Sequence, residues 1–377
     1  MIYFDNAATT KFKPLSVKAN FIKSLIFYSA NPGRSAHKAS IKCAEQVFFT
    51  RKLVAEFFGL ASAERVVFTS NCSEALNLAI LGSAKENGHI ITTIYEHNSV
   101  LRPLKFLKDT KNIDFSIVEP DKEGKLQLTD FEKLIKNNTY AIIVNHTSNV
   151  TGITQNLTEL GALCKKYNLL FIVDSAQSAG HTKINMRKSK ISMLAFAAHK
   201  GLHGAQGLGG LCVNEDITLS PIKFGGTGTS SFDLVQPNNF PEGFEVGTVN
   251  LPAIMALGSA IKFSSKNFDK INKKISLLSN YFYTKLKQTK HLYFPPCDKK
   301  TGVFSFAIEG VSSSTAASIL DYKFGICVRS GYHCAPLVHK FYNSTDGLIR
   351  VSLDYKNTTK QIDKFFDAIQ QIRDENK

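Results

Sequence analysis

The chain has 377 residues, of which 43% are hydrophobic and 20% charged, a composition typical of a folded globular protein. This length exceeds one ordinary core and predicts two domains. The net charge of +15 would suit an acidic partner such as nucleic acid, but only eight of the 46 basic residues are arginine. A lysine-biased, solvated surface is therefore favoured over a nucleic-acid-binding face, in which clustered arginines and interleaved aromatic side chains are expected.

No stretch reaches the roughly 20 apolar residues that cross a bilayer. The first residues, MIYFDNAATT, contain neither a basic leader nor an apolar run of signal-peptide length. We therefore expect a cytoplasmic protein with no membrane partner. The seven cysteines are scattered and form no CxxC pair, a pattern that indicates neither a disulfide framework nor a zinc site.

Residues 16–260 are predicted to form a large α/β domain. The strand VVFTS (66–70) precedes the helical pattern SEALNLAILGSA, and LTELGALCKKYN is a second helical pattern. Further strands are predicted at 89–96, 141–148, 169–174 and 191–198. Continuous apolar strands separated by helices are typical of a parallel sheet covered on both faces. After the last strand, His199-Lys200 is followed by a glycine-rich segment, GLHGAQGLGGL, which we expect to be a turn.

Residues 1–15 and 261–377 are predicted to form a smaller α+β domain. A long helical pattern covers 251–288, and we expect a break near Ser264–Asn267. Strands are predicted at GVFSFAIEG and GLIRVSLD, and a helix at STAASILDYKF. A C-terminal amphipathic helix is predicted to begin at TTKQIDKFFDAI.

Polar residues follow several of the predicted strands, where ligands bind in open α/β sheets. Cys72 and Ser73 open a helix whose free N–H groups and hydroxyl would hold a phosphate, although an ordinary helix cap has the same pattern. Asp174 ends a buried strand, where a carboxylate is costly unless a cation pairs with it. His97 and Lys200 also follow apolar runs.

A partly desolvated lysine near another cation has a lowered pKa and can form a Schiff base with an aldehyde. Pyridoxal 5'-phosphate requires such a lysine. It also requires an anion site, a partner for its pyridine nitrogen and a group that stacks on its ring. Each of these features is weak alone, but the set is specific.

These residues lie in motifs that resemble the cysteine desulfurases, pyridoxal-phosphate enzymes with the class V aminotransferase fold. The matching stretches are YFDNAATT, NPGRSAH, SEALNLAI, EHNSVLRPL, SNVTGI, VDSAQSAGH, HKGLHGAQGLGGL, FEVGTVN and RSGYHCAP. Within the family, the chain is similar to the branch with a short catalytic loop, related to SUF-type desulfurases and selenocysteine lyases. The resemblance implies the PLP-dependent transferase fold type I. In this fold a large, mainly parallel-sheet cofactor domain accompanies a smaller α+β domain.

The resemblance also implies roles around the cofactor ring. Lys200 would bond to the cofactor aldehyde, and Asp174 would keep the pyridine nitrogen protonated. Gln177 would contact the phenolic oxygen. His97 would stack on the ring and help to move protons.

For the cofactor phosphate, the resemblance implies donors from Cys72, Ser73 and His199. Thr248, in FEVGTVN, would reach the phosphate of the neighbouring subunit, which implies a homodimer with shared active sites. Many relatives carry Ser or Thr two positions before the histidine, where this chain has Ala197. A missing bond of that kind would weaken cofactor binding by about 1.5–3 kcal/mol. Cys72 likewise occupies a position that often holds a hydroxyl.

The implied reaction removes sulfur from L-cysteine, giving L-alanine and a persulfide on Cys334. The persulfide would pass to an acceptor protein, for iron–sulfur cluster assembly or tRNA thiolation. Glycine and proline lie near Cys334 and His333 precedes it; a nearby cation would lower its pKa. Cys327, with apolar neighbours, is expected to be a buried strand residue.

Three residues are expected at the substrate. Arg350, in GLIRVSLD, would bind the substrate carboxylate through its planar fork. Arg329 matches a second motif arginine, which lines the catalytic loop, and Asn149 matches a residue near the cofactor oxygen and the substrate. Two departures from the family's usual residues weaken the assignment of the substrate. Tyr332 stands where SUF-type relatives often have histidine, and His203 stands where a tyrosine is usual.

Three alternatives remain open at this stage. The first is a selenocysteine lyase or another β-elimination enzyme of the same fold. The second is a module that binds the cofactor and relays sulfur without catalysis. The third is a nucleic-acid-binding role for the basic surface, whose affinity for tRNA would fall steeply with added salt.

Overall fold

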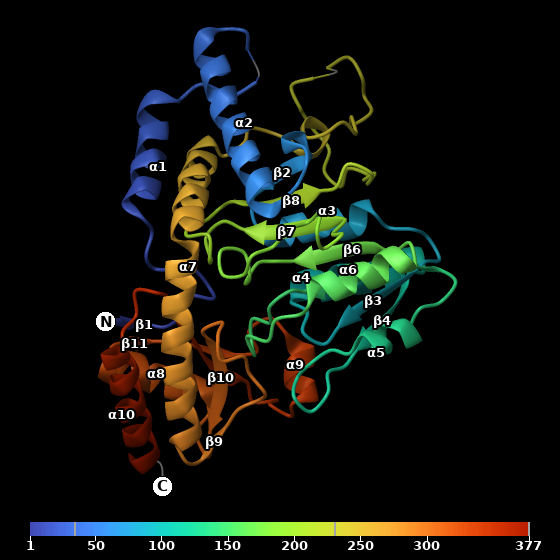
Figure 1. Ribbon diagram of the computed structural model, residues 1–377. Helices are drawn as coiled ribbons and strands as arrows, with labels where there is room; N and C mark the ends of the chain where they lie inside the picture. The colour runs from blue at the N-terminus through green and yellow to red at the C-terminus, as the bar shows by residue number, and fades with distance from the viewer. Residues whose placement is uncertain (34, 230, 376–377) are drawn as a thin grey trace.

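The computed structural model describes residues 1–33, 35–229 and 231–375, so that Arg34 of the NPGRSAH motif lies outside the described residues. Its largest sheet has seven strands in the order β2-β8-β7-β6-β5-β3-β4 (Figure 1). The strands are β2 (Val66–Thr69), β3 (His89–Thr93), β4 (Asp114–Val118), β5 (Thr139–Asn145), β6 (Leu170–Asp174), β7 (Met193–Ala197) and β8 (Gly209–Val213). All neighbouring pairs from β4 to β7 are parallel, which confirms the mainly parallel sheet, and only β8 pairs antiparallel with its neighbours.

Strand β8 shows that the predicted turn after Lys200 is wrong for the last three residues of the segment, 209–211. A Cβ at Gly209 would lie 2.5 Å from the Asn71 carbonyl carbon, and one at Gly210 would lie 2.5 Å from the Phe196 ring. These glycines therefore serve close packing of a strand, not a turn. Gly209 lets β8 lie against the start of α3 (Cys72–Gly82), and Gly210 leaves room for the Phe196 ring of β7.

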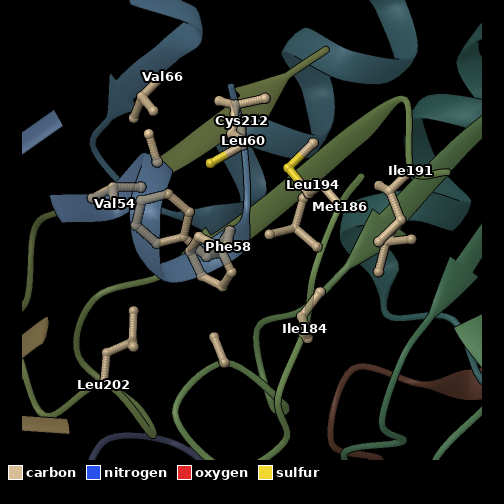
Figure 2. Packing of buried hydrophobic residues seen from close by; sticks show 14 of the residues in the cluster. Val54, Phe58, Leu60, Val66, Ile184, Met186, Ile191, Leu194, Leu202 and Cys212 are labelled. Carbon is tan, nitrogen blue, oxygen red and sulfur yellow. The ribbon is translucent and has the colours of Figure 1, made fainter. Parts of the chain in front are cut away.

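Helices cover both faces of this sheet, and alternate strand residues face the two layers. Phe171 and Val173 of β6 pack with α2 (Lys38–Phe58) and α6 (Leu157–Lys166). Ile172, between them, packs with α3 and α4 (Asn98–Lys111) on the other face. Figure 2 shows the first layer, in which Phe58 of α2 lies beside Val54 and close to strand residues of β7; the Phe58 and Phe196 rings are 5.4 Å apart.

Helix α7 (Leu251–Gln288) is continuous, so the predicted break near Ser264–Asn267 is wrong. The polar residues there have partners that do not interrupt the helix: Asn267 donates to the Phe263 carbonyl one turn earlier, and Ser264 donates to the Leu202 carbonyl. The first half of α7 packs on the large sheet together with α1 (Leu15–Phe27), and its second half reaches the second sheet (Figure 1).

The second sheet is antiparallel, in the order β12-β13-β10-β9. Its strands are β9 (Leu292–Tyr293), β10 (Val303–Ile308), β12 (Arg329–Gly331) and β13 (Leu348–Ser352), with helices α8 (Ser313–Phe324), α9 (Pro336–Phe341) and α10 (Thr359–Glu375) nearby. The short strands β1 (Ile2–Tyr3) and β11 (Ile326–Cys327) pair in parallel beside it. Phe4 is buried in the core of this sheet. The division of the chain into two domains between residues 260 and 261 remains a prediction.

The remaining elements are α5 (Leu128–Lys133) and the short 3₁₀ helices at Ala63–Arg65 and Glu242–Phe244. Cys327 does lie on a strand but is only half-buried, with its thiol 3.8 Å from a carboxylate oxygen of Asp321. The expectation that it is buried is therefore wrong, because β11 is an edge of a two-stranded sheet. In the part of the chain that the structure describes, no helix is long and apolar enough to span a bilayer.

Gly209→Ala is expected to lower the free energy of unfolding by about 1–3 kcal/mol, the usual cost of inserting a methyl group where no space exists. The added Cβ would collide with the backbone of Asn71 and Cys72, which cannot rotate away as a side chain can. Urea unfolding followed by circular dichroism measures the change. An unaltered midpoint would mean that β8 and α3 separate without cost.

Candidate active site

The candidate site lies at the carboxyl ends of the neighbouring parallel strands β6 and β7, where Asp174 is the last residue of β6 and Lys200 follows β7. Asp174 is buried, and one of its carboxylate oxygens accepts the Ala176 N–H at 2.8 Å. The same oxygen lies 3.7 Å from the Cys72 Sγ. The carboxylate expected from the sequence thus lies at the sheet edge with its second oxygen available to a ligand.

Lys200 is held in place through its backbone. The preceding carbonyl, that of His199, accepts bonds from the Thr10 N–H at 3.1 Å and from the Lys13 Nζ at 2.8 Å. Burial lowers the pKa of Lys200; the negative charge of Asp174 opposes this shift, and the arginines at 350 and 329 add to it. Among the described residues, its Nζ has no hydrogen-bond partner, so the amine is positioned and open to reaction.

The start of α3 provides the candidate anion site. Asn71 caps the helix by accepting the Glu74 N–H at 2.9 Å, and the N–H groups of Cys72 and Ser73 have no acceptor within the helix. The Cys72 thiol points to Asp174, and burial raises its pKa well above the ordinary value. Its side chain is therefore a neutral neighbour of Asp174, and only its backbone remains as a phosphate donor.

His97 caps α4 and is fixed in one tautomer. Its Nδ1 accepts the Ser99 N–H at 3.1 Å, which places the ring proton on Nε2. Ser99 Oγ lies 2.8 Å from the same nitrogen and 2.6 Å from Ser73 Oγ, so His97 is connected to the anion site. Burial lowers the pKa of His97 to about 4, although Asp174 acts in the opposite direction. The ring is therefore neutral at pH 7. The sequence analysis did not identify Ser99.

Glu96, the residue before His97, is a buried carboxyl group. Its Oε1 accepts bonds from Thr93 Oγ1 at 2.7 Å and from the Asn145 N–H at 3.0 Å, and its Oε2 has no partner among the described residues. Burial raises its pKa to about 8 in spite of these bonds. At pH 7 it is therefore mainly the neutral acid, and it adds little negative charge to the site.

Arg350, on β13, is buried beneath the site. Its Nη2 lies 3.0 Å from Asp5 Oδ1, its Nη1 donates to the Asn149 carbonyl at 3.2 Å, and its Nε has no partner in the described part of the chain. Arg329 on β12 is its cross-strand neighbour. The sequence analysis missed Asp5, although it lies within the quoted YFDNAATT motif.

The backbone of the loop that carries Cys334 is bonded to both neighbouring segments. The Asn98 N–H donates to the Cys334 carbonyl at 2.7 Å, and the Asn149 amide donates to the His333 carbonyl at 2.6 Å. Both His333 and Cys334 have positive φ, of 51° and 57°, a conformation that L-residues rarely adopt. The loop therefore holds Cys334 in a defined place.

His333 does not supply the cation expected beside Cys334. Its Nε2 donates to the Leu348 carbonyl at 3.0 Å, and burial lowers its pKa to about 2. The neutral ring is a structural anchor. Arg350 is a cation within electrostatic range of the Cys334 thiol.

Two separate hollows are lined by expected residues. One, of about 580 Å³, is lined by Ser73, His97 and Cys334 together with residues of α4. A smaller hollow is lined by Lys200 and Gln177, whose amide donates to the Ala7 carbonyl at 3.0 Å. The anion site, the histidine and the cysteine thus share one cavity, and Lys200 opens into the other.

The remaining expected residues line neither hollow; they are Cys72, Asn149, Asp174, His199, Thr248, Arg329 and Arg350. Thr248 is exposed, and its hydroxyl is 3.5 Å from the Asn31 amide, so this chain does not use it at its own site. The His199 ring has a pKa lowered to about 4, first by burial, and its Nδ1 has no partner among the described residues. In the part of the chain that the structure describes, no three or more His, Cys, Asp or Glu side chains are grouped so that they could hold a metal ion.

Glu96→Gln is expected to make stability less dependent on pH. An acid with a folded-state pKa near 8 destabilises the fold progressively as pH rises from its unfolded value near 4.5. The variant should therefore gain about 1.4 kcal/mol over the native protein for each pH unit between about 5 and 8. Urea unfolding at several pH values between about 5 and 8 measures this difference in the free energy of unfolding. Glu309→Gln, which changes an exposed carboxylate, is the control. A constant difference would contradict the burial of a neutral acid.

Comparison with known proteins places this geometry in a family. The model of the family described as "Aminotransferase class-V" matches residues 2–365. The chain is 35% identical to a probable cysteine desulfurase of Pyrococcus abyssi, over 99% of this chain and 94% of the relative. It is 31% identical to one of Methanothermobacter thermautotrophicus, over 98% and 94%.

Solved structures agree. The apo structure of a cysteine desulfurase from Thermococcus onnurineus NA1 is similar with a TM-score of 0.92 at 34% identity, covering 99% of this chain and 95% of that one. A cysteine desulfurase from Escherichia coli shares the fold with a TM-score of 0.89 at 22% identity, covering 100% and 95%. The chain belongs to the class-V aminotransferase family, among relatives named as cysteine desulfurases.

Proposed function

We propose that the protein is a pyridoxal-phosphate-dependent cysteine desulfurase. It would convert L-cysteine to L-alanine and leave the sulfur as a persulfide on Cys334. The observation that carries the proposal is the cavity in which Cys334 meets His97 and Ser73, at the same end of the sheet as Lys200 and Asp174. The names of the relatives support the same activity.

The site residues fit pyridoxal 5'-phosphate. The unpartnered Lys200 amine would bond to its aldehyde, Asp174 would accept the pyridine N–H, and the free N–H groups of Cys72 and Ser73 would bind its phosphate. Gln177 would contact the phenolic oxygen after exchanging its bond to Ala7. When bound, the cofactor supplies an electron sink that stabilises negative charge at the substrate Cα.

The protein's own groups would move the protons. Burial keeps a larger share of Lys200 neutral than water would, so its Nζ can accept the proton from the substrate Cα. His97, neutral with its proton on Nε2, can stack on the cofactor ring and donate from that atom. Arg350 would bind the substrate carboxylate through its guanidinium, beside the bond it already makes to Asp5.

The sulfur transfer would use Cys334 as the nucleophile. Its thiolate attacks the Sγ of L-cysteine, so that the new S–S bond forms as the Cβ–Sγ bond breaks. The electron pair from the broken bond remains on the substrate, and Cβ takes a proton to give L-alanine. The persulfide would then pass to the thiol of an acceptor protein, for iron–sulfur cluster assembly or tRNA thiolation.

A homodimer with shared sites is part of the proposal. Exposed apolar side chains gather on α1 and on the loop near residue 230, and both lie at the same end of the molecule as α2 (Figure 1). They are Leu15, Ile22, Leu25, Ile26, Phe27, Phe224, Phe232, Leu234 and Val235. Covering such a surface with a second copy would carry Thr248 to the partner's phosphate site, which accounts for its exposure here.

The test compares Cys334→Ala with Lys200→Ala, each loaded with pyridoxal phosphate. Cys334→Ala should keep the visible absorbance of the bound cofactor and lose persulfide formation, with alanine release falling on the order of 10²–10⁴-fold. Lys200→Ala should lose both the native absorbance and alanine release. Cys327→Ala, which removes a half-buried thiol on β11, is the matched control and should retain activity.

Undiminished alanine release by either active-site variant would overturn the proposal. Pyruvate in place of alanine would indicate β-elimination, and turnover of L-selenocysteine alone would indicate a selenocysteine lyase. A cofactor band with no product from either amino acid would indicate a sulfur-relay module.

A further inference from the structure

His203 is one of several buried histidines that take no part in the site described above. His203 follows Lys200 by three residues, is 0% exposed and has a positive φ of 60°. Its Nε2 lies 2.9 Å from Oδ2 of Asp354, which is 3% exposed. The two residues are 151 positions apart in the chain, so this bond joins separate segments.

At one end, the pair is tied to the backbone of Lys200. The His203 N–H donates to the Lys200 carbonyl at 2.8 Å, and the Gly204 N–H donates to the Ala198 carbonyl at 2.7 Å. A Cβ at Gly201 would lie 2.4 Å from the Ala179 carbonyl oxygen, so the turn has no free space beneath it. A displacement of the His203 backbone must therefore displace the Lys200 turn as well.

At the other end, the pair is tied to the strand that carries Arg350. Asp354 follows β13 and is four residues beyond Arg350. Its second carboxylate oxygen accepts the Lys356 N–H at 3.0 Å, and its own N–H donates to Asn357 Oδ1 at 2.7 Å. The carboxylate is thus rigid with respect to the end of β13.

Aromatic rings surround the bond and exclude water. Tyr355 and Phe263 pack against the His203 ring with centroid distances of 5.7 and 6.3 Å, and Phe12 packs on Tyr355 at 5.7 Å. In such a low-dielectric setting a hydrogen bond to a carboxylate is strengthened, and removal of one partner leaves a costly buried charge. Sliding of the two segments past each other is therefore opposed.

We propose that His203 and Asp354 form a positioning pair that fixes the substrate-binding Arg350 relative to Lys200. The inference rests on the proposed function for the roles of those two residues. Neither His203 nor Asp354 contacts the reacting atoms. Their effect is to hold the amine and the guanidinium, which come from different sheets, at one separation.

The test uses His203→Ala, Asp354→Ala, the double variant and His203→Gln in the full-length protein loaded with pyridoxal phosphate. Each alanine variant should raise the KM for L-cysteine at least fivefold and lower kcat by a smaller factor, because the Lys200 turn is also loosened, and the double variant should be no worse than either. His203→Gln should restore the KM to within twofold, because the glutamine Nε2 can reach Asp354 from the same backbone position. His291→Ala is the control, since it removes an exposed histidine–carboxylate bond of 2.8 Å on the second sheet.

A second readout needs no activity. Hydrogen–deuterium exchange should rise in residues 200–208 and 348–354 together, in each of the two alanine variants. An unchanged KM with only a lower unfolding midpoint would overturn the proposal, as would exchange that rises only around the substituted residue. If the native protein releases no alanine, the proposed function fails. Hydrogen–deuterium exchange in residues 200–208 and 348–354 then remains the test of whether His203 and Asp354 hold these two segments together.

Discussion

The site depends on the hydrogen bonds that the N-terminal segment makes to both sheets. Thr10 and Lys13 bind the carbonyl before Lys200, whereas the Phe4 carbonyl accepts the N–H of Ser352, two residues after Arg350, at 2.6 Å. The Ala7 N–H donates to the Ser352 hydroxyl at 2.8 Å. A segment of ten residues thus fixes the two cations on which both cofactor and substrate binding would rely.

Burial determines the charge states within this frame. Desolvation keeps His97 and His333 neutral, and it raises the pKa of Glu96 towards 8. The same cause lowers the pKa of Lys200 and so enlarges its neutral fraction. The groups that would move protons are therefore set by their depth in the protein more than by individual ion pairs.

The sequence was sufficient to predict where the strands end and which functional residues lie at or after those ends. Asp174, His97 and Lys200 each come after an apolar run, and parallel pairing brings such positions to one edge. It was not sufficient for β8, because the close packing of Gly209 against the start of α3 and of Gly210 against Phe196 leaves no local pattern in the sequence. The continuity of α7 was also hidden, because its polar residues bond to carbonyls that only the folded chain supplies.

Contacts between segments far apart in the chain are the main feature that the sequence did not predict. Asp5 and Arg350 are 345 positions apart, and neither residue alone indicates the other. The sequence analysis singled out His203 as a departure from its relatives, but not its partner Asp354. Pairing across such separations follows from the topology, which hydrophobic periodicity does not specify.

The charges of the site favour anionic ligands both at the start of α3 and at Arg350. Lys200, Arg350 and Arg329 act on one another, and the carboxylates that offset them among the described residues are Asp174 and Asp5. The neutral histidines and the neutral Glu96 do not alter this balance. A phosphate at the start of α3 and a carboxylate at Arg350 would each supply negative charge where the fold leaves positive charge underpaired. Binding of the two anions would then stabilise the same buried cations that the N-terminal segment holds in place.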